Sequence, residues 1–151
     1  MARHLGMFTS VGALVAASLL VAAPASAVAP ANDDFDAAAP LSAGGSSTVD
    51  NTEATLEAEE PRPSCNTMVS GSVWYSFTPA ANDRFQVDTL DTIGVDTVLA
   101  IYEGNTLGGL WEVACNDDSN ATASKVVTQL SGGTTYWIQV SNYEWAAAGS
   151  I

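Results

Sequence analysis

The fold is constrained most by a series of short segments in which apolar and polar residues alternate, separated by clusters of turn-forming residues. Six such segments follow one another along the chain, at 72–78, 84–90, 97–102, 110–115, 125–130 and 135–141. Alternation with a period of two places every second side chain on one face of a sheet, and no long segment after residue 27 has the period of a helix. The sequence therefore predicts an all-β, antiparallel sandwich or barrel.

The alternation also predicts which side chains face the core. Val73, Tyr75 and Phe77 share one face, which places Trp74 on the opposite face. Trp137 lies opposite the aromatic and aliphatic residues of its own segment in the same way. Two tryptophans on an outer face would form a flat platform for a sugar or a peptide, unless loops or the N-terminal turn cover them.

The only two cysteines, Cys65 and Cys115, suggest a disulfide. In an exported chain an even count favours one bridge, and two free thiols are the alternative. The bridge would close a loop of about 50 residues and stabilise the fold by roughly 4 kcal/mol through chain entropy. Alternation in the segment 110–115 places Trp111, Val113 and Cys115 on one face.

The N-terminus has the organisation of a secretory signal peptide. A short basic start at Arg3 is followed by an apolar run that ends at Ala25-Ser26-Ala27, a small-x-small cleavage motif. Polar interruptions and Pro24 argue against the alternative, a membrane anchor. We therefore predict that residues 1–27 are removed and that the mature protein is secreted, extracellular or at the cell surface.

Residues 28–151 have the length of one domain. Gly149-Ser150-Ile151 resemble the first residues of a further strand, because a sandwich that stopped there would expose an edge. We therefore expect this β-sandwich domain to be truncated before its last strand.

Charge narrows the classes of partner. The chain has a formal net charge of −13, and Arg62, Arg84 and Lys125 are the only cations after residue 27, against 17 carboxylates. Without a basic patch, binding to nucleic acid or to an anionic membrane is disfavoured. The only histidine, His4, lies in the signal segment, so histidine-containing triads and imidazole zinc sites are not expected in the mature chain. We expect a protein that is not an enzyme, although two carboxylates alone suffice for glycoside hydrolysis.

The first candidate metal site is at the N-terminus. Asn32, Asp33 and Asp34, with the nearby Glu57 and Glu59, offer the oxygen ligands that calcium prefers. The alternative is structural: Asn32 would cap a short helical turn, and the two aspartates would face the positive end of its dipole.

The second candidate metal site combines Asp96 with Asn116, Asp117 and Asp118. Asp96 precedes one predicted strand and the other three residues follow another. The alternative is an Asx-rich turn, in which these side chains bond their own backbone.

Several segments occur in the order seen in bacterial pre-peptidase C-terminal domains, and the chain resembles that family, to which the collagen-binding domains of clostridial collagenases are similar. They are Asn32–Phe35, Ser72–Phe77, Asp96–Tyr102, Val113–Asp118 and Gly133–Val140. The resemblance implies a jelly-roll β-sandwich with one short N-terminal helical turn. It also implies a non-catalytic role in secretion, substrate targeting or adhesion, with an extracellular protein, a polysaccharide or downstream domains of the same polypeptide as partner.

In the collagen-binding relatives an Asn-Asp pair binds calcium, and Asn32 and Asp33 match that pair. The chain departs from the family pattern at 70–73, where the relatives have aspartates and this sequence has none, so Glu57, Glu59 or Glu60 would have to replace them. The domain also follows the signal segment directly, which places any enzyme beyond Ile151. Two other functions remain open: a carbohydrate-binding module that uses Trp74 and Trp137, or the N-terminal fragment of a secreted hydrolase.

Overall fold

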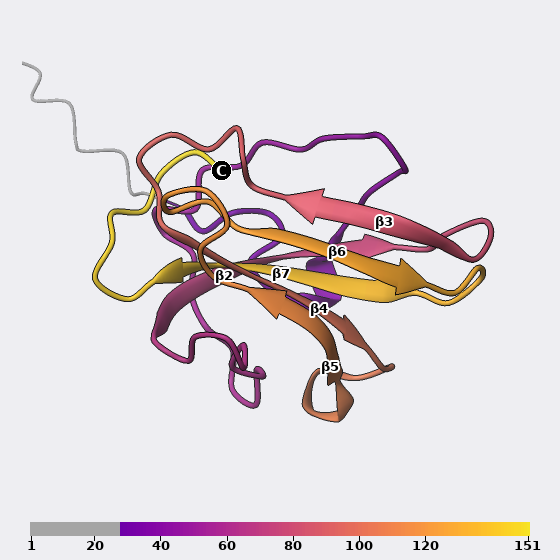
Figure 1. Cartoon of the computed structure of the whole chain (residues 1–151). Coiled ribbons are helices and arrows are strands. Elements are labelled where there is room, and N and C mark those ends of the chain that lie inside the picture. Colours follow the sequence, from indigo (N-terminus) through magenta and orange to yellow (C-terminus); the bar gives the residue numbers. More distant parts are fainter. Residues whose placement is uncertain (1–27) are drawn as a thin grey trace, which may run out of the picture.

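The computed structural model describes residues 28–151, and the predicted signal peptide lies outside the described residues. The described chain forms two β-sheets and two isolated 3-10 turns (Figure 1). The predicted all-β sandwich is therefore confirmed. Within the described part, no helix has the length and apolar character needed to cross a membrane.

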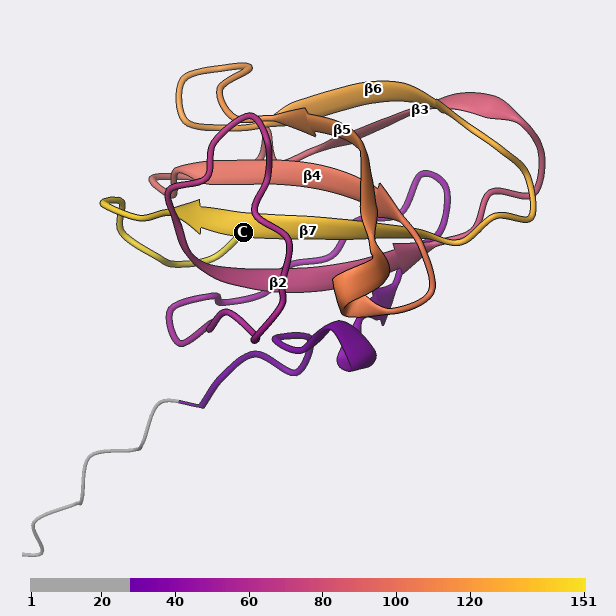
Figure 2. The same cartoon turned by 90° about the horizontal axis from the view of Figure 1, so that it is seen from below.

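The larger sheet has five strands and the smaller sheet has two. In spatial order the larger sheet contains β1 (Ala39–Pro40), β2 (Val69–Phe77), β7 (Tyr136–Tyr143), β4 (Thr97–Glu103) and β5 (Trp111–Asn116). The smaller sheet contains β3 (Asp83–Asp88) and β6 (Lys125–Leu130), and the 3-10 turns are η1 (Phe35–Ala37) and η2 (Leu107–Gly109). β1 is parallel to β2 and all other pairs are antiparallel. Figure 2 shows β2, β7 and β4 side by side. All six segments predicted from alternation contain strands.

The main core lies between the two sheets. It contains the side chains predicted to face inward: Val73, Tyr75, Phe77, Tyr136, Ile138 and Val140. From the smaller sheet, Phe85 packs edge-on against Phe77 with ring centroids 5.0 Å apart. The period-two pattern thus sorts the apolar side chains of β2 and β7 correctly.

A second apolar cluster lies on the outer face of the larger sheet, under the N-terminal segment. Trp74 is 0% exposed there, and Phe35 of η1 packs edge-on against it at a centroid distance of 5.4 Å. Trp137 lies 4.4 Å from the Phe35 ring, and its Nε1 donates to the carbonyl of Gly104 at 2.9 Å. The hypothesis of a tryptophan platform is therefore wrong for Trp74, because η1 covers the face on which it lies.

Hydrogen bonds with β2 and residue 55 hold this cover in place. Asn32 and Trp74 exchange two bonds, Nδ2 to carbonyl at 3.0 Å and N–H to carbonyl at 2.8 Å. Asp33 accepts from both the N–H and the hydroxyl of Thr55, at 2.6 and 2.8 Å. The capping role predicted for Asn32 is wrong: Asp34 is the N-cap of η1, and it makes no side-chain cap bond. Asn32 is hydrogen-bonded to a buried strand, so its side-chain amide is not available to cap the three-residue turn.

A set of hydrogen-bonded, largely buried polar side chains joins residues 57–60 to the outer face of the larger sheet. Glu60 accepts hydrogen bonds from Gln139 Nε2 at 2.5 Å, from Glu57 N–H at 2.8 Å and from the Ser72 hydroxyl. Burial raises the pKa of Glu60, and these three bonds act against that rise. The Tyr102 hydroxyl donates to Gln139 Oε1 at 2.9 Å, and burial also raises the pKa of Tyr102.

Strand β5 departs from regular alternation. Its register with β4 shifts between Ile101 and Tyr102, so that two residues of β5 face one of β4. Val113 therefore packs on the inner core, whereas Cys115 packs on the outer cluster. The prediction that these two residues share a face is wrong because of this bulge.

Candidate metal site

Three carboxylates meet where the start of β4 lies beside the end of β5. Asp96 immediately precedes β4, and Asp117 and Asp118 follow β5. These strands are antiparallel neighbours, with Leu99 opposite Asn116, which brings the two acidic positions together. One oxygen from each of Asp96, Asp117 and Asp118 lies within 4.8 Å of the others. Among residues 28–151 this is the one place where three or more acidic, histidine or cysteine side chains approach so closely.

The backbone on both sides of the cluster is fixed. The carbonyl of Asp96 accepts the N–H of Tyr143 at 3.0 Å, which ties it to the end of β7. Thr97 N–H donates to the carbonyl of Thr122 at 2.9 Å. The Ser124 hydroxyl bonds to the carbonyls of both Thr97 and Asp117. The loop after β5 is thus held against the start of β4 without any contribution from the carboxylates.

Asp117 is the member of the cluster that has a buried carboxylate oxygen without a partner. Its Oδ2 accepts from Asn66 Nδ2 at 2.9 Å. Its Oδ1 is buried and has no hydrogen-bond partner among the described residues. A buried carboxylate oxygen without a partner is costly, so it calls for a compensating donor or ion.

The disulfide positions Asn66, which sequence reasoning missed. Cys65 and Cys115 form the predicted bridge, with their Cα atoms 5.8 Å apart. Asn66 follows one of these cysteines and Asp117 lies two residues after the other. The sequence did contain a signal for this contact, because a bridge between the two cysteines also brings the residues next to them together.

Burial and like charges both act on the carboxylates of the cluster. The pKa of Asp96 is raised, first by burial and then by the negative charges of Asp118 and Asp117. Asn116, predicted to join the metal ligands, instead uses its Oδ1 to accept the N–H of Lys125 at 2.8 Å. The cluster therefore concentrates negative charge, and a cation bound among its oxygens would relieve the repulsion.

The N-terminal candidates are arranged differently. The side chains of Asn32 and Asp33 are hydrogen-bonded as described above, and Glu57 Oε2 accepts the N–H of Phe35 at 2.5 Å. Asp34 and Glu59 are exposed. These acids hold the cover on the outer face, and the structure does not gather three of them into one group.

The chemistry of the ligand oxygens determines which ion the cluster can bind. Calcium takes six to eight oxygen ligands at about 2.3–2.6 Å, and carboxylates and backbone carbonyls supply them in proteins. Asp96, Asp117 and Asp118 offer such oxygens from two adjacent segments. No family model, curated protein or solved structure matched this chain.

Proposed function

We propose that this chain is a non-catalytic, secreted β-sandwich module whose Asp96, Asp117 and Asp118 bind calcium. The observation that carries the proposal is the buried, unpartnered Oδ1 of Asp117 beside two further carboxylates. A calcium ion would satisfy this oxygen and offset the negative charges of Asp118 and Asp117, which act together with the larger effect of burial to raise the pKa of Asp96.

Calcium is preferred to other metals because of the ligand chemistry. The only histidine is His4, and both cysteines are in the disulfide, so the cluster offers hard oxygen ligands alone. Such ligands suit calcium and magnesium better than zinc or copper. Magnesium demands near-ideal octahedral geometry and retains its waters, whereas calcium accepts the irregular geometry of two loop segments.

The family resemblance supports an accessory role. Asp96 begins one of the segments that carry the resemblance to pre-peptidase C-terminal domains, and Asp117 and Asp118 end another. In this proposal calcium binds the carboxylates of a loop whose backbone is already held in place, and the module targets or attaches a secreted protein to an extracellular protein or polysaccharide. The burial of Trp74 argues against the alternative carbohydrate-binding platform.

The test is thermal unfolding of residues 28–151 in calcium and in EDTA. Extracellular calcium modules bind with Kd of about 0.1–1 mM, and calcium at ten times Kd stabilises the fold by about 1.4 kcal/mol. We expect the midpoint to rise by about 4–7 °C for a domain of this size. Asp117→Asn should abolish the rise while keeping the shape of the side chain.

The matched control is Glu53→Gln, which removes an exposed carboxylate outside the cluster. It should keep the full response to calcium. Equal midpoints in calcium and EDTA, or a response that survives Asp117→Asn, would contradict the proposal.

A further inference from the structure

The segment before β2 reaches the candidate metal site by crossing the outer face of the larger sheet. In that sheet β7 and β4 separate β2 from β5, so no ladder of backbone hydrogen bonds joins the start of β2 to the end of β5. The bridge between Cys65 and Cys115 nevertheless holds their Cα atoms 5.8 Å apart. Figure 2 shows the chain before β2 passing across β7 and β4 towards β5. Side-chain contacts, and not strand pairing, therefore hold residues 64–68 beside β5.

Asn66 connects the bridge to the acidic cluster. Its Nδ2 donates to Asp117 Oδ2 at 2.9 Å, across a sequence separation of 51 residues. Its Oδ1 accepts the N–H of Met68 at 3.0 Å, which fixes the orientation of the amide and keeps the donor turned towards the carboxylate. Because a carboxylate is planar, holding Oδ2 also fixes Oδ1, the buried oxygen without a partner. Asn66 therefore sets the position of the oxygen that the proposed calcium ion would bind.

The bridge is the strongest restraint on the position of Asn66. The hydrogen bonds that the described chain makes between residues 64–65 and β5 are all exposed: Ser64 donates its N–H and its hydroxyl to Glu112 at 2.7 and 2.5 Å, and the Cys65 N–H donates to Cys115 Sγ at 3.3 Å. Such hydrogen bonds contribute about 1 kcal/mol each. Without the covalent bond, Asn66 would be held beside Asp117 by weak contacts alone.

The bridge is open to attack by thiols. Cys65 is exposed and Cys115 is half-buried. A dithiol reduces such a bridge in two exchanges: one thiolate attacks a cysteine sulfur to form a mixed disulfide, and the second thiolate then releases the protein. The S–S bond of the protein gains two electrons and two protons and becomes two thiols, while the dithiol leaves as a cyclic disulfide. The covalent restraint on residues 64–68 is then lost.

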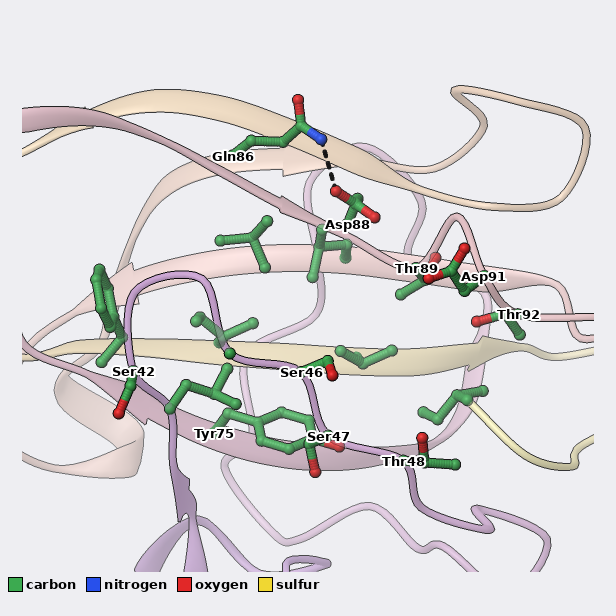
Figure 3. A pocket seen from close by; sticks show the side chains of 18 of the residues that line it. Ser42, Ser46, Ser47, Thr48, Tyr75, Gln86, Asp88, Thr89, Asp91 and Thr92 are labelled. Atoms are coloured by element: carbon green, nitrogen blue, oxygen red, sulfur yellow. Dashed lines mark hydrogen bonds between the residues drawn. The ribbon is translucent and has the colours of Figure 1, made fainter.

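The main core lies on the other side of the larger sheet and does not include the bridge. Neither cysteine belongs to this core, and Cys115 packs on the outer cluster instead. On the inner face, a hollow of about 390 Å³ lies between β3 and residues 42–48 (Figure 3), and it is lined by neither cysteine nor their chain neighbours. We therefore expect opening of the bridge to release residues 64–68 from the outer face and to leave the inner packing in place.

We propose that Asn66 is a positioning residue for calcium and couples the ion to the bridge, so that the oxidised protein binds calcium about tenfold more tightly than the reduced protein. The inference rests on the proposed function, because it concerns the same three carboxylates. Residues that orient a metal ligand through a hydrogen bond contribute about 10–100-fold to metal affinity. Coupling between two equilibria is reciprocal, so bound calcium makes the bridge harder to reduce by the same factor.

The reciprocal effect is measured on residues 28–151 of the wild type. The protein is equilibrated with mixtures of reduced and oxidised dithiothreitol, in about 10 mM CaCl2 or in EDTA with NaCl at the same ionic strength. Thiol trapping and mass spectrometry give the reduced fraction, and circular dichroism shows whether the reduced chain stays folded. For a Kd of about 0.1–1 mM, calcium should raise the midpoint ratio of dithiol to disulfide about five- to tenfold, or by about 20–30 mV. Asp117→Asn should show no shift.

Two variants of the crossing segment form a matched pair in the bridged protein. Asn66→Ala removes the bond to Asp117 and should weaken calcium binding about tenfold in titration calorimetry. In the same variant calcium should no longer move the reduction midpoint. Ser64→Ala removes a hydroxyl that bonds Glu112, outside the cluster, and should leave the calcium affinity within about twofold.

Replacing both cysteines tests the coupling without a reductant. The protein with Cys65→Ser and Cys115→Ser should bind calcium about tenfold more weakly than the wild type. Adding Asn66→Ala to it should lower the affinity little further, because both changes act through one contact. The pair Asn66→Ala and Ser64→Ala keeps the bridge, and it decides the question even if the protein without the bridge does not fold.

Unchanged calcium affinity in Asn66→Ala would overturn the inference, as would a reduction midpoint that calcium does not move. A loss of about a hundredfold in the combined variant would also overturn it, because the bridge and Asn66 would then act independently. In each of these cases the wild type still responds to calcium in thermal unfolding, so the proposed function stands. The absence of any calcium response in the oxidised wild type would overturn both.

Discussion

At the scale of single residues, Asp96 contributes to how the stability of the metal-free protein changes with pH. Its pKa is raised in the folded state, so folding disfavours its charged form. This destabilisation is absent below the ordinary aspartate pKa of about 3.9 and grows as the pH rises through the folded value.

Asp96→Asn removes that destabilising charge. In EDTA at pH 7 we expect the variant to unfold about 1–2 °C above the wild type, a small gain because solvent screens the group. The difference should vanish near pH 3. In calcium the order should reverse, since the variant loses a ligand. Thermal unfolding followed by circular dichroism across this pH range tests the prediction, and a variant less stable than the wild type in EDTA at pH 7 would contradict it.

Individual residues also show where sequence reasoning stopped. The proximity of Asp96, Asp117 and Asp118 could be anticipated because acidic side chains flank two predicted strands. Asn116 could not be told apart from them, since its side chain turns to a backbone N–H that only the folded loop places there. For Trp74 the alternation predicted the outer face correctly, but not that Phe35, 39 residues earlier in the chain, would cover it.

At the scale of elements, η1 is the lid of the outer cluster. Phe35 is 5% exposed and contacts both Trp74 and Trp137. Phe35→Ala should cost about 3–5 kcal/mol of unfolding free energy, because it leaves a cavity and admits water to Trp74. Urea denaturation measures the loss, and tryptophan emission should shift to the red in the folded variant.

The control lies in the same turn. Asp36 is exposed, so Asp36→Ala should change stability by less than about 0.5 kcal/mol. A comparable loss in both variants would show that the turn itself, rather than the packing of the Phe35 ring, supports the face.

Regular strands were predictable and irregular ones were not. Val73, Tyr75 and Phe77 of β2 and Tyr136, Ile138 and Val140 of β7 occupy every second position, so periodicity identifies both the strand and its inner face. In β5 one additional residue breaks the alternation, so side chains before and after it no longer follow one pattern of faces. Nothing about Val113 in the sequence indicates this bulge. The unequal size of the two sheets also depends on pairing between distant segments, which alternation does not encode.

At the scale of the whole molecule, the imbalance of charge acts on stability. With three cations against 17 carboxylates after residue 27, self-repulsion favours unfolding at low ionic strength. Raising NaCl from about 10 to about 150 mM shortens the Debye length from about 30 to about 8 Å, which should increase the unfolding midpoint.

This effect should be the same for the wild type and for Asp117→Asn, because screening does not require the cluster. At matched ionic strength, CaCl2 should add a further rise in the wild type alone. A calcium response that NaCl reproduces in full would assign the stabilisation to screening and not to a site.

The bridge between Cys65 and Cys115 has a consequence for how the module would carry tension. It encloses β2 to β5, so a pull applied at Val28 and Ile151 bypasses the enclosed chain. A sequence separation of 50 residues corresponds to roughly 170 Å of extended chain that stays locked until the bond is reduced. A tether built from this module would therefore be short and stiff in an oxidising medium, and would lengthen abruptly where thiols are abundant.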